Sequence, residues 1–374
     1  YCWGYGGYGQ IGDGTTTSAN PAPTLVDLPA GETTKSVTVG NGHTCAISNT
    51  DTLYCWGWNS DSQLGDGSTT NSGTPIDVGA TIIPGGTYAI AVEAGGYHTC
   101  IILVAETTHC WGDNEKGQLG DGTTTDRTTL VEPVSAPNAR GFAGYPVEMS
   151  ERDFDGDGFT NILDVHYSCD SGTYHDPFTR SSCVSTDAGH YFDRSETSVL
   201  IVGGYFVCTS MEDGSLYCWG ENNYGQVGDE TATERHTPVQ VTLPEGRTVS
   251  QGDGGETHTC AVMDDGSLYC WGHGTDGQLG DATGNNRDVP TEVGGTTWTS
   301  GESATEVSTG DYHTCAVMDD GKMECWGRGA QGQLGLGNTI DYYSPQSVRT
   351  QPVGGSQLPS DYTATSIATG AQHT

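Results

Sequence analysis

Hydrophobic and polar residues alternate along residues 258–272, which read His-Thr-Cys-Ala-Val-Met-Asp-Asp-Gly-Ser-Leu-Tyr-Cys-Trp-Gly. This period of two predicts two half-buried strands. Between them, Asp264-Asp265-Gly266 predicts a three-residue hairpin loop with the glycine in the left-handed region. In that register Cys260 lies opposite Cys270, within reach of a disulfide. Trp271 is expected to pack beside this bridge.

The same stretch recurs along the chain. Cys-Trp-Gly begins at residues 2, 55, 110, 218, 270 and 325, and a second block such as Gly-Gln-Leu-Gly-Asp-Gly follows each copy, as at 117–122. Neighbouring intact copies lie 52 to 55 residues apart, with sequence for four short strands, which predicts a propeller or a similar closed array. The glycines of the second block permit positive φ and close approach between blades.

These blocks resemble the repeat of the regulator of chromosome condensation family, whose units carry comparable Gly-x-x-His-Thr-x-Ala, Gly-x-x-Tyr-x-Trp-Gly and Gly-Gln-Leu-Gly sequences. The resemblance covers residues 1–135 and 199–374. It implies an all-β fold, a β-propeller of six to seven four-stranded blades, with seven favoured as the family's usual number. Fold does not carry chemistry with it. The acidic, cystine-rich chain is more similar to secreted bacterial propellers that bind proteins than to nucleotide-exchange or chromatin-binding members.

The repeat is interrupted between Cys110 and Cys208, which lie 98 residues apart where intact copies need 42 to 45. We therefore divide the chain into propeller blades at 1–135, an insertion or degenerate blade at 136–198, and further blades at 199–374. The segment 136–198 either fills a seventh blade position or departs from a six-bladed array. Because it alone differs from its neighbours, it is expected to form the distinctive contact surface.

The insertion contains the sequence of a calcium-binding loop. Oxygen-bearing side chains fall at positions 1, 3, 5, 9 and 12, with glycine at 6 and a backbone carbonyl at 7. The predicted ligands of one Ca²⁺ are Asp153, Asp155, Asp157, the Phe159 carbonyl, Asn161 and Asp164. The aspartate at position 12 resembles the dockerin loop, although dockerins carry two such loops, and the acidic core also resembles calcium hairpins of integrin-type blades. The alternative is an acidic surface turn without metal.

The 13 cysteines indicate the redox environment. Ten of them form pairs separated by ten residues across a predicted hairpin, which favours disulfides and an oxidising compartment. The predicted hairpin bridges are Cys45–Cys55, Cys100–Cys110, Cys208–Cys218, Cys260–Cys270 and Cys315–Cys325. Metal binding is the alternative, because a histidine precedes four of these pairs by two residues, but zinc sites usually show shorter cysteine spacing.

Two further features concern the remaining cysteines. The sequence around Cys169 and Cys183 resembles one unit of extracellular Cys-rich repeats, and this resemblance implies a Cys169–Cys183 bridge. Cys2 is left unpaired. Since the chain opens on the second half of the motif and closes on the first half, we expect it to be a segment of a longer protein.

Charge and motifs exclude several functions. The net charge is −35, which argues against nucleic acid and anionic membrane surfaces as partners. No apolar run is long enough for a membrane-spanning helix. We find no nucleophile elbow, phosphate-binding loop or zinc-protease motif, and acidic pairs such as Asp264-Asp265 occupy turn positions rather than the positions of glycosidase carboxylates. The repeated tryptophans are assigned to the core, whereas Trp58 and Trp298 lie outside the repeat and are candidate surface contacts.

These observations predict a module without catalytic activity that lies outside the cell or at its surface. It would be an adhesin, surface-layer or filament component, would bind protein or glycan, and could self-assemble. The alternative is an accessory binding domain of a larger secreted hydrolase.

Overall fold

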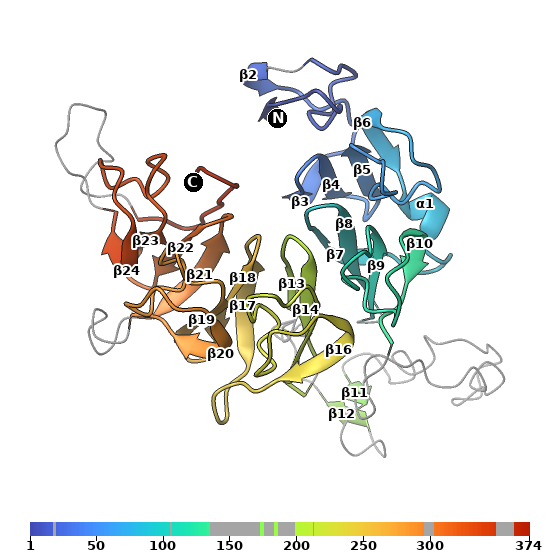
Figure 1. Ribbon diagram of the computed structural model, residues 1–374. Coiled ribbons are helices and arrows are strands. Elements are labelled where there is room, and N and C mark those ends of the chain that lie inside the picture. The colour runs from blue at the N-terminus through green and yellow to red at the C-terminus, as the bar shows by residue number, and fades with distance from the viewer. Residues whose placement is uncertain are drawn as a thin grey trace. The chain divides into compact units, whose positions relative to one another are not determined.

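Five four-stranded antiparallel sheets make up most of the larger of two units in the computed structural model (Figure 1). The larger unit comprises Tyr1–Phe142 and Ser198–Thr374, and the smaller comprises Ala143–Thr197. The structure describes residues 1–17, 20–104, 107–134, 173–175, 183–185, 199–211, 213–294, 303–348 and 363–374. Within these residues, the smaller unit contains the strand pair β11 (Thr173–His175) and β12 (Cys183–Ser185).

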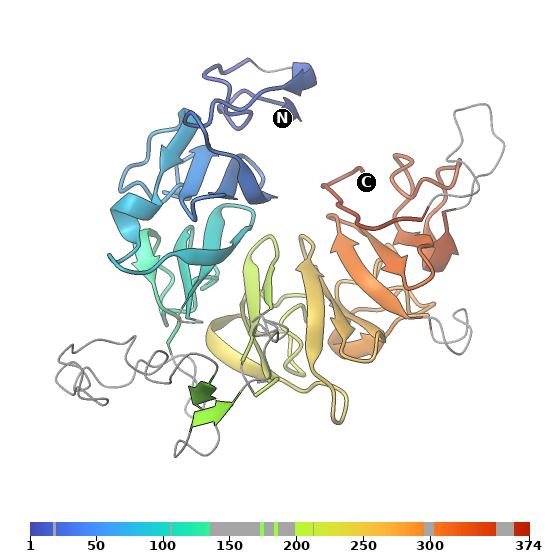
Figure 2. The same ribbon diagram turned by 180° about the vertical axis from the view of Figure 1, so that it is seen from behind.

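Each of the five sheets is one blade, with its strands in sequence order (Figure 2). Blade 1 contains β3 (Thr34–Val39), β4 (His43–Ser48), β5 (Leu53–Gly57) and β6 (Ser72–Asp77). Blade 2 contains β7 (Ala89–Ala94), β8 (His98–Leu103), β9 (Thr108–Gly112) and β10 (Arg127–Val131). Blade 3 contains β13 (Leu200–Val202), β14 (Phe206–Ser210), β15 (Leu216–Gly220) and β16 (Arg235–Val241). Blade 4 contains β17 (Val249–Gly254), β18 (His258–Met263), β19 (Leu268–Gly272) and β20 (Arg287–Glu292). Blade 5 contains β21 (Ala304–Thr309), β22 (His313–Met318), β23 (Met323–Gly327) and β24 (Tyr342–Ser347).

Smaller elements complete the larger unit. The strands β1 (Cys2–Gly4) and β2 (Asn20–Thr24) pair with each other, and a four-residue helix, α1 (Gly79–Ile82), follows β6. In the described parts of the chain, no helix has the length and hydrophobicity needed to cross a bilayer.

The central hairpin of each blade has the predicted register. Cys260 lies directly opposite Cys270, and Gly266 adopts a φ of 82° in the loop between their strands. Disulfides join the same five pairs that the spacing predicts, and the Cα atoms of Cys260 and Cys270 are 4.2 Å apart. Within the described residues, Cys2 is a free cysteine, as predicted, and its side chain is half-buried.

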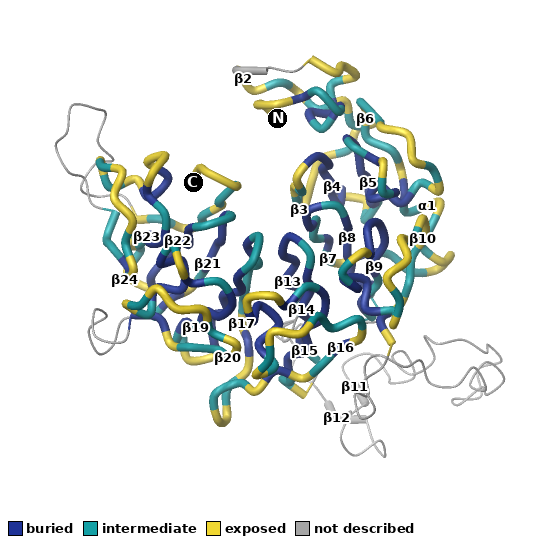
Figure 3. The backbone as a smooth tube through the Cα atoms, viewed as in Figure 1, coloured by how far each residue is buried: buried dark blue, intermediate teal, exposed yellow. Residues whose placement is uncertain are grey.

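Apolar clusters fill the junctions between neighbouring blades. Figure 3 shows the central strands of each blade buried and the outermost strands more exposed. Cys270 and Trp271 are consecutive residues of one strand, so their side chains point to opposite faces. Cys270 therefore lies in the cluster between blades 4 and 5, whereas Trp271 lies in the cluster between blades 3 and 4. The expectation that Trp271 packs beside its own bridge is wrong, because it packs with the preceding blade's bridge, Cys208–Cys218.

The described residues account for six blades, not the favoured seven. The described residues form five complete blades and, in the β1–β2 pair with its Cys-Trp-Gly sequence, part of a sixth. No blade lies between blades 2 and 3, because β13 contacts β7 and β8 directly. Val202 shares one core cluster with Cys100 and Cys110. The long interval in the sequence therefore holds an insertion between adjacent blades.

Several predicted residues lie outside the part of the chain that the structure describes. They are the six calcium ligands, Cys169 and Trp298. Cys183 is described only as part of the backbone of β12. The calcium site and the Cys169–Cys183 bridge therefore stay predictions.

Candidate functional site

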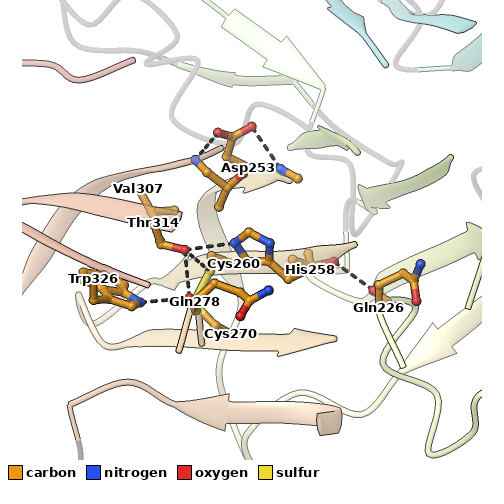
Figure 4. Close-up of a disulfide and its surroundings, with 12 residues drawn as sticks. Gln226, Asp253, His258, Cys260, Cys270, Gln278, Val307, Thr314 and Trp326 are labelled. Carbon is orange, nitrogen blue, oxygen red and sulfur yellow. Dashed lines mark hydrogen bonds between the residues drawn. A yellow bond between two sulfur atoms is a disulfide. The ribbon is translucent and has the colours of Figure 1, made fainter. Parts of the chain in front are cut away.

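A hydrogen-bonded cluster joins blades 4 and 5 (Figure 4), and blades 1 and 2 are joined in the same way. At the junction of blades 4 and 5, His258 Nε2 lies 2.9 Å from Thr314 Oγ1. The Thr314 hydroxyl donates to the main-chain carbonyl of Gln278 at 2.8 Å, and Trp326 Nε1 donates to the same oxygen at 2.9 Å. The repeated histidine, threonine, tryptophan and glutamine thus meet at one point, although they come from different sequence blocks.

The junction histidines are buried and neutral. Because Thr314 gives its proton to the Gln278 carbonyl, its oxygen accepts from His258 Nε2, which fixes the proton on that nitrogen. Burial lowers the pKa of His258 to about 3 and that of His43 to about 4. The His258 ring lies against Gly255, where an added Cβ would come within 2.6 Å of Nδ1. His258 and His43 each bond to a threonine of the next blade. Within the described residues no three metal-ligating side chains converge.

Two junctions, one on either side of blade 3, lack part of this cluster. At the junction with blade 4, Thr259 and Trp271 still donate to the Gln226 carbonyl, but the histidine is missing. Blade 3 has Phe206 and Val207 where the other complete blades have His-Thr. His98 of blade 2 is fully buried, and neither of its ring nitrogens has a hydrogen-bond partner among the described residues. Trp219 still donates to the Gln118 carbonyl at 2.8 Å. The junction of blades 2 and 3 therefore keeps its tryptophan contact but leaves a buried imidazole unsatisfied.

Val207→Thr should complete that junction. A hydroxyl at this position can donate to the Gln118 carbonyl and accept from His98 Nε2, as Thr99 does with Gln63 and His43. We expect the free energy of unfolding to rise by about 1 kcal/mol, measured by urea denaturation. The reverse change, Thr99→Val, should lower it by about 1–3 kcal/mol.

A double-mutant cycle tests the mechanism of this gain. In a His98→Phe background, Val207→Thr should no longer stabilise the protein, because the hydroxyl loses its imidazole partner. If Val207→Thr destabilised the otherwise wild-type protein, as a hydroxyl in an apolar site would, the predicted hydrogen bond to His98 would be wrong.

Two partly buried carboxylates lie on inner strands. Glu93 on β7 and Asp253 on β17 occupy the same blade position, opposite the first cysteine of each central hairpin. Thr38 Oγ1 donates to Glu93 at 2.9 Å, and the Thr309 amide donates to Asp253 at 2.7 Å. Burial, with a smaller contribution from the charge of Asp253, raises the pKa of Glu93 to about 7. Neither residue was singled out from the sequence, although each lies seven residues before a motif cysteine.

Glu93→Gln should stabilise the protein at pH 8 and not at pH 5. The folded-state pKa of about 7 exceeds the ordinary value of 4.5, so the folded protein retains the proton longer than the unfolded chain. Stability therefore falls as pH rises from 4.5 to 7, by roughly 3 kcal/mol. The side-chain amide of Glu93→Gln does not ionise, so the variant does not lose this stability. Urea denaturation of both proteins at pH 5 and pH 8 measures the difference. An equal effect at both would show that Glu93 titrates normally.

The central hairpins of the five blades end in loops that are linked to one another. In each blade, the main-chain amide of the residue after Cys-Trp-Gly donates a hydrogen bond to the carbonyl of the residue before the second strand, which is β4, β8, β14, β18 or β22. In blade 1, the Trp58 amide donates to the Gly42 carbonyl at 2.8 Å. Adjacent blades are joined by further bonds, including Gly96 to Gly204 at 3.0 Å and Gly204 to Gly255 at 3.1 Å. These loops are called the loop face below.

Four aromatic rings follow one another across the loop face. Tyr8 stacks on Trp58 with ring centroids 4.4 Å apart, Trp58 meets Tyr97 edge to face at 5.5 Å, and Tyr97 lies 6.0 Å from Tyr205. Trp58 lies over Gly42, where a Cβ would come within 2.8 Å of the indole, so this position requires glycine. All four side chains are partly exposed. The structure thus places the candidate contact Trp58 within this aromatic row, defined as Tyr8, Trp58, Tyr97 and Tyr205.

Three partly or fully buried carboxylates lie in loops of the loop face. Burial raises the pKa of Asp113, Glu256 and Asp311. Burial, together with neighbouring tyrosine and carboxylate charges, raises the pKa of Tyr205 to about 12. None of the three acids forms an ion pair with a described residue. The loop face therefore combines exposed rings with uncompensated negative charge.

The repeat itself identifies the family. A family model, the regulator of chromosome condensation (RCC1) repeat, matches residues 1–47, 50–102, 213–262, 265–317 and 320–374, which is more than half of the chain. A second RCC1 repeat model matches 35–63, 89–118, 249–278 and 304–333. The chain belongs to the RCC1 repeat family. The resemblance inferred from the sequence blocks is thereby confirmed.

Two relatives differ in how much of their own length the match covers. The ultraviolet-B receptor UVR8 of Arabidopsis thaliana is 29% identical over 361 residues, covering 94% of this chain and 78% of UVR8. The human ubiquitin-protein ligase HERC2 is 25% identical over 352 residues, but this match covers 93% of the chain and only 6% of HERC2. Ligase activity therefore does not follow from the RCC1 repeats.

Solved structures support the RCC1 fold. Human WBSCR16 matches with a TM-score of 0.67 and 18% identity, covering 94% of this chain and 76% of that protein. Prp20p of Saccharomyces cerevisiae matches with a TM-score of 0.52 and 19% identity, covering 93% and 85% of the two chains. At these sequence identities, the similarity shows a shared fold and nothing about function.

Proposed function

We propose that this RCC1 chain is a non-catalytic, protein-binding propeller that acts outside the cell or at its surface. The aromatic row carries the binding part of this proposal. Tyr8, Trp58, Tyr97 and Tyr205 place partly exposed rings side by side, and tyrosine and tryptophan are enriched where proteins bind one another.

The disulfides support the oxidising compartment. Each of the five complete blades has one, and structural disulfides persist mainly in secreted and extracellular proteins. Prp20p, which is similar in fold, binds Gsp1p and histones. A protein partner for the present chain is therefore in keeping with the fold, although its identity would differ.

Photo-crosslinking tests this function. A benzophenone amino acid at Tyr97 should form a covalent adduct with another protein in the native host. The same probe at Ile340, which is 58% exposed and lies in the loop before β24, should not. An adduct of twice the chain mass would identify a second copy as the partner. No protein adduct at Tyr97, or equal adducts at both positions, would exclude the proposed binding surface.

We also propose that the insertion binds one Ca²⁺ through Asp153, Asp155, Asp157, Phe159, Asn161 and Asp164. The support is the spacing of hard oxygen donors in the sequence. Calorimetric titration should show one calcium site in the wild type and none in Asp155→Ala. Unchanged calcium binding in the variant would remove this proposal and leave the propeller proposal intact.

A further inference from the structure

We propose that the loop face binds a partner segment rich in lysine or arginine, whose cations lie over Tyr97 and Tyr205. This inference rests on the protein-binding role proposed above and adds the chemical class of the partner.

Blade 5 provides an internal precedent for such a contact. The guanidinium of Arg328 lies over the ring of Tyr312, 5.4 Å from the centroid, within the range of a cation–π interaction. Tyr312 precedes β22 as Tyr97 precedes β8 and Tyr205 precedes β14, and the Arg328 amide donates to the Tyr312 carbonyl at 2.9 Å. The loop geometry therefore presents a tyrosine ring to a cation at this position.

Blades 2 and 3 have the same loop geometry but an acid in place of the arginine. The Asp113 amide donates to the Tyr97 carbonyl at 3.0 Å, and the Glu221 amide donates to the Tyr205 carbonyl at 2.8 Å. Each tyrosine thus pairs with an acidic residue at the position that Arg328 has in blade 5. A lysine or arginine from a partner would contact both the ring and the carboxylate.

The electrostatics of the loop face favour the same partner. Asp113, Glu256 and Asp311 are desolvated without an ion pair among the described residues. A bound cation would compensate charges that burial otherwise destabilises. Lys116, at the same end of blade 2, contacts Glu234 at 3.3 Å. A second copy of the chain fits less well, because its charge is also −35.

A defined peptide tests the inference on the full chain. The probe is a fluorescein-labelled peptide of Lys-Gly repeats, measured by fluorescence anisotropy at physiological salt. We expect saturable binding that weakens as salt rises. The same peptide with acetylated lysines should bind at least about tenfold more weakly, because acetylation removes the charge that both the ring and the carboxylate recognise.

Matched variants locate the site. Asp113→Asn with Glu221→Gln should weaken binding by about tenfold, since each acid adds a contact to a cation. Glu245→Gln with Asp319→Asn removes the same charge from exposed loops at the other end of the hairpins and should change binding less than about twofold. Asp113→Arg, which reproduces the arrangement of blade 5, should block the site at Tyr97. Thermal unfolding confirms that each variant is folded.

Two outcomes would overturn the inference: no saturable binding of the lysine peptide, or equal weakening by both double variants. If the Tyr97 probe still captured a protein, only the basic character of the partner would be wrong. If it captured none, the proposed function itself would fail.

Discussion

Replacing Trp271 with alanine is expected to lower the free energy of unfolding by about 3–5 kcal/mol. The side chain is fully buried between blades 3 and 4, and its Nε1 donates to the Gln226 carbonyl at 2.9 Å. Alanine leaves a cavity at the junction and removes one of the two donors to that carbonyl, the other being Thr259. Trp271→Phe, which keeps an aromatic ring, should cost less.

Trp58→Ala is the matched control for this experiment. Trp58 is partly exposed on the loop face and stacks on Tyr8, so its truncation should cost about 1 kcal/mol or less. Urea denaturation of both variants gives the comparison. Equal losses would mean that the motif tryptophan does not hold the blades together.

Removing one hairpin disulfide is expected to cost about 2–3 kcal/mol. The bridge Cys260–Cys270 closes a loop with a sequence separation of ten residues, for which the entropy of the unfolded chain predicts this value. The double variant Cys260→Ala, Cys270→Ala should therefore unfold at lower urea concentration. Cys2→Ser changes a cysteine that is free and should leave stability unchanged.

Reduction of all hairpin bridges extends this test. Because the blades share core clusters, loss of the five disulfides should lower the unfolding temperature far more than the single double variant does. An unchanged unfolding temperature after complete reduction would show that the bridges add nothing to the blade cores.

Local features of the fold could be predicted from the sequence. The hairpin around Gly266 and the opposition of Cys260 and Cys270 depend on residues close together in the chain, so alternation and turn chemistry determine them. The blade count could not be obtained in this way. An interval of two repeat lengths between Cys100 and Cys208 has the same length whether it contains a blade or an insertion, and only contacts between β13 and β7 decide.

The aromatic row could not be predicted from the sequence, because its members come from different repeats. Trp58 could be singled out because it departs from the repeat, but its neighbours Tyr8 and Tyr97 come from other repeats. Tyr97 and Tyr205 are 108 residues apart in the sequence and become neighbours because blades 2 and 3 are adjacent. The unsatisfied His98 likewise becomes visible only when Val207 is seen at its junction.

The most direct test of the disulfide-bonded propeller is the state of the hairpin cysteines in protein isolated from its natural source. Alkylation with iodoacetamide under native, non-reducing conditions, followed by peptide mass analysis, distinguishes thiols from disulfides. We predict that all ten hairpin cysteines are unmodified and recovered as five linked pairs, while Cys2 is alkylated. Alkylation of both cysteines in the hairpin pairs would contradict the disulfide-bonded propeller and the oxidising compartment proposed for it.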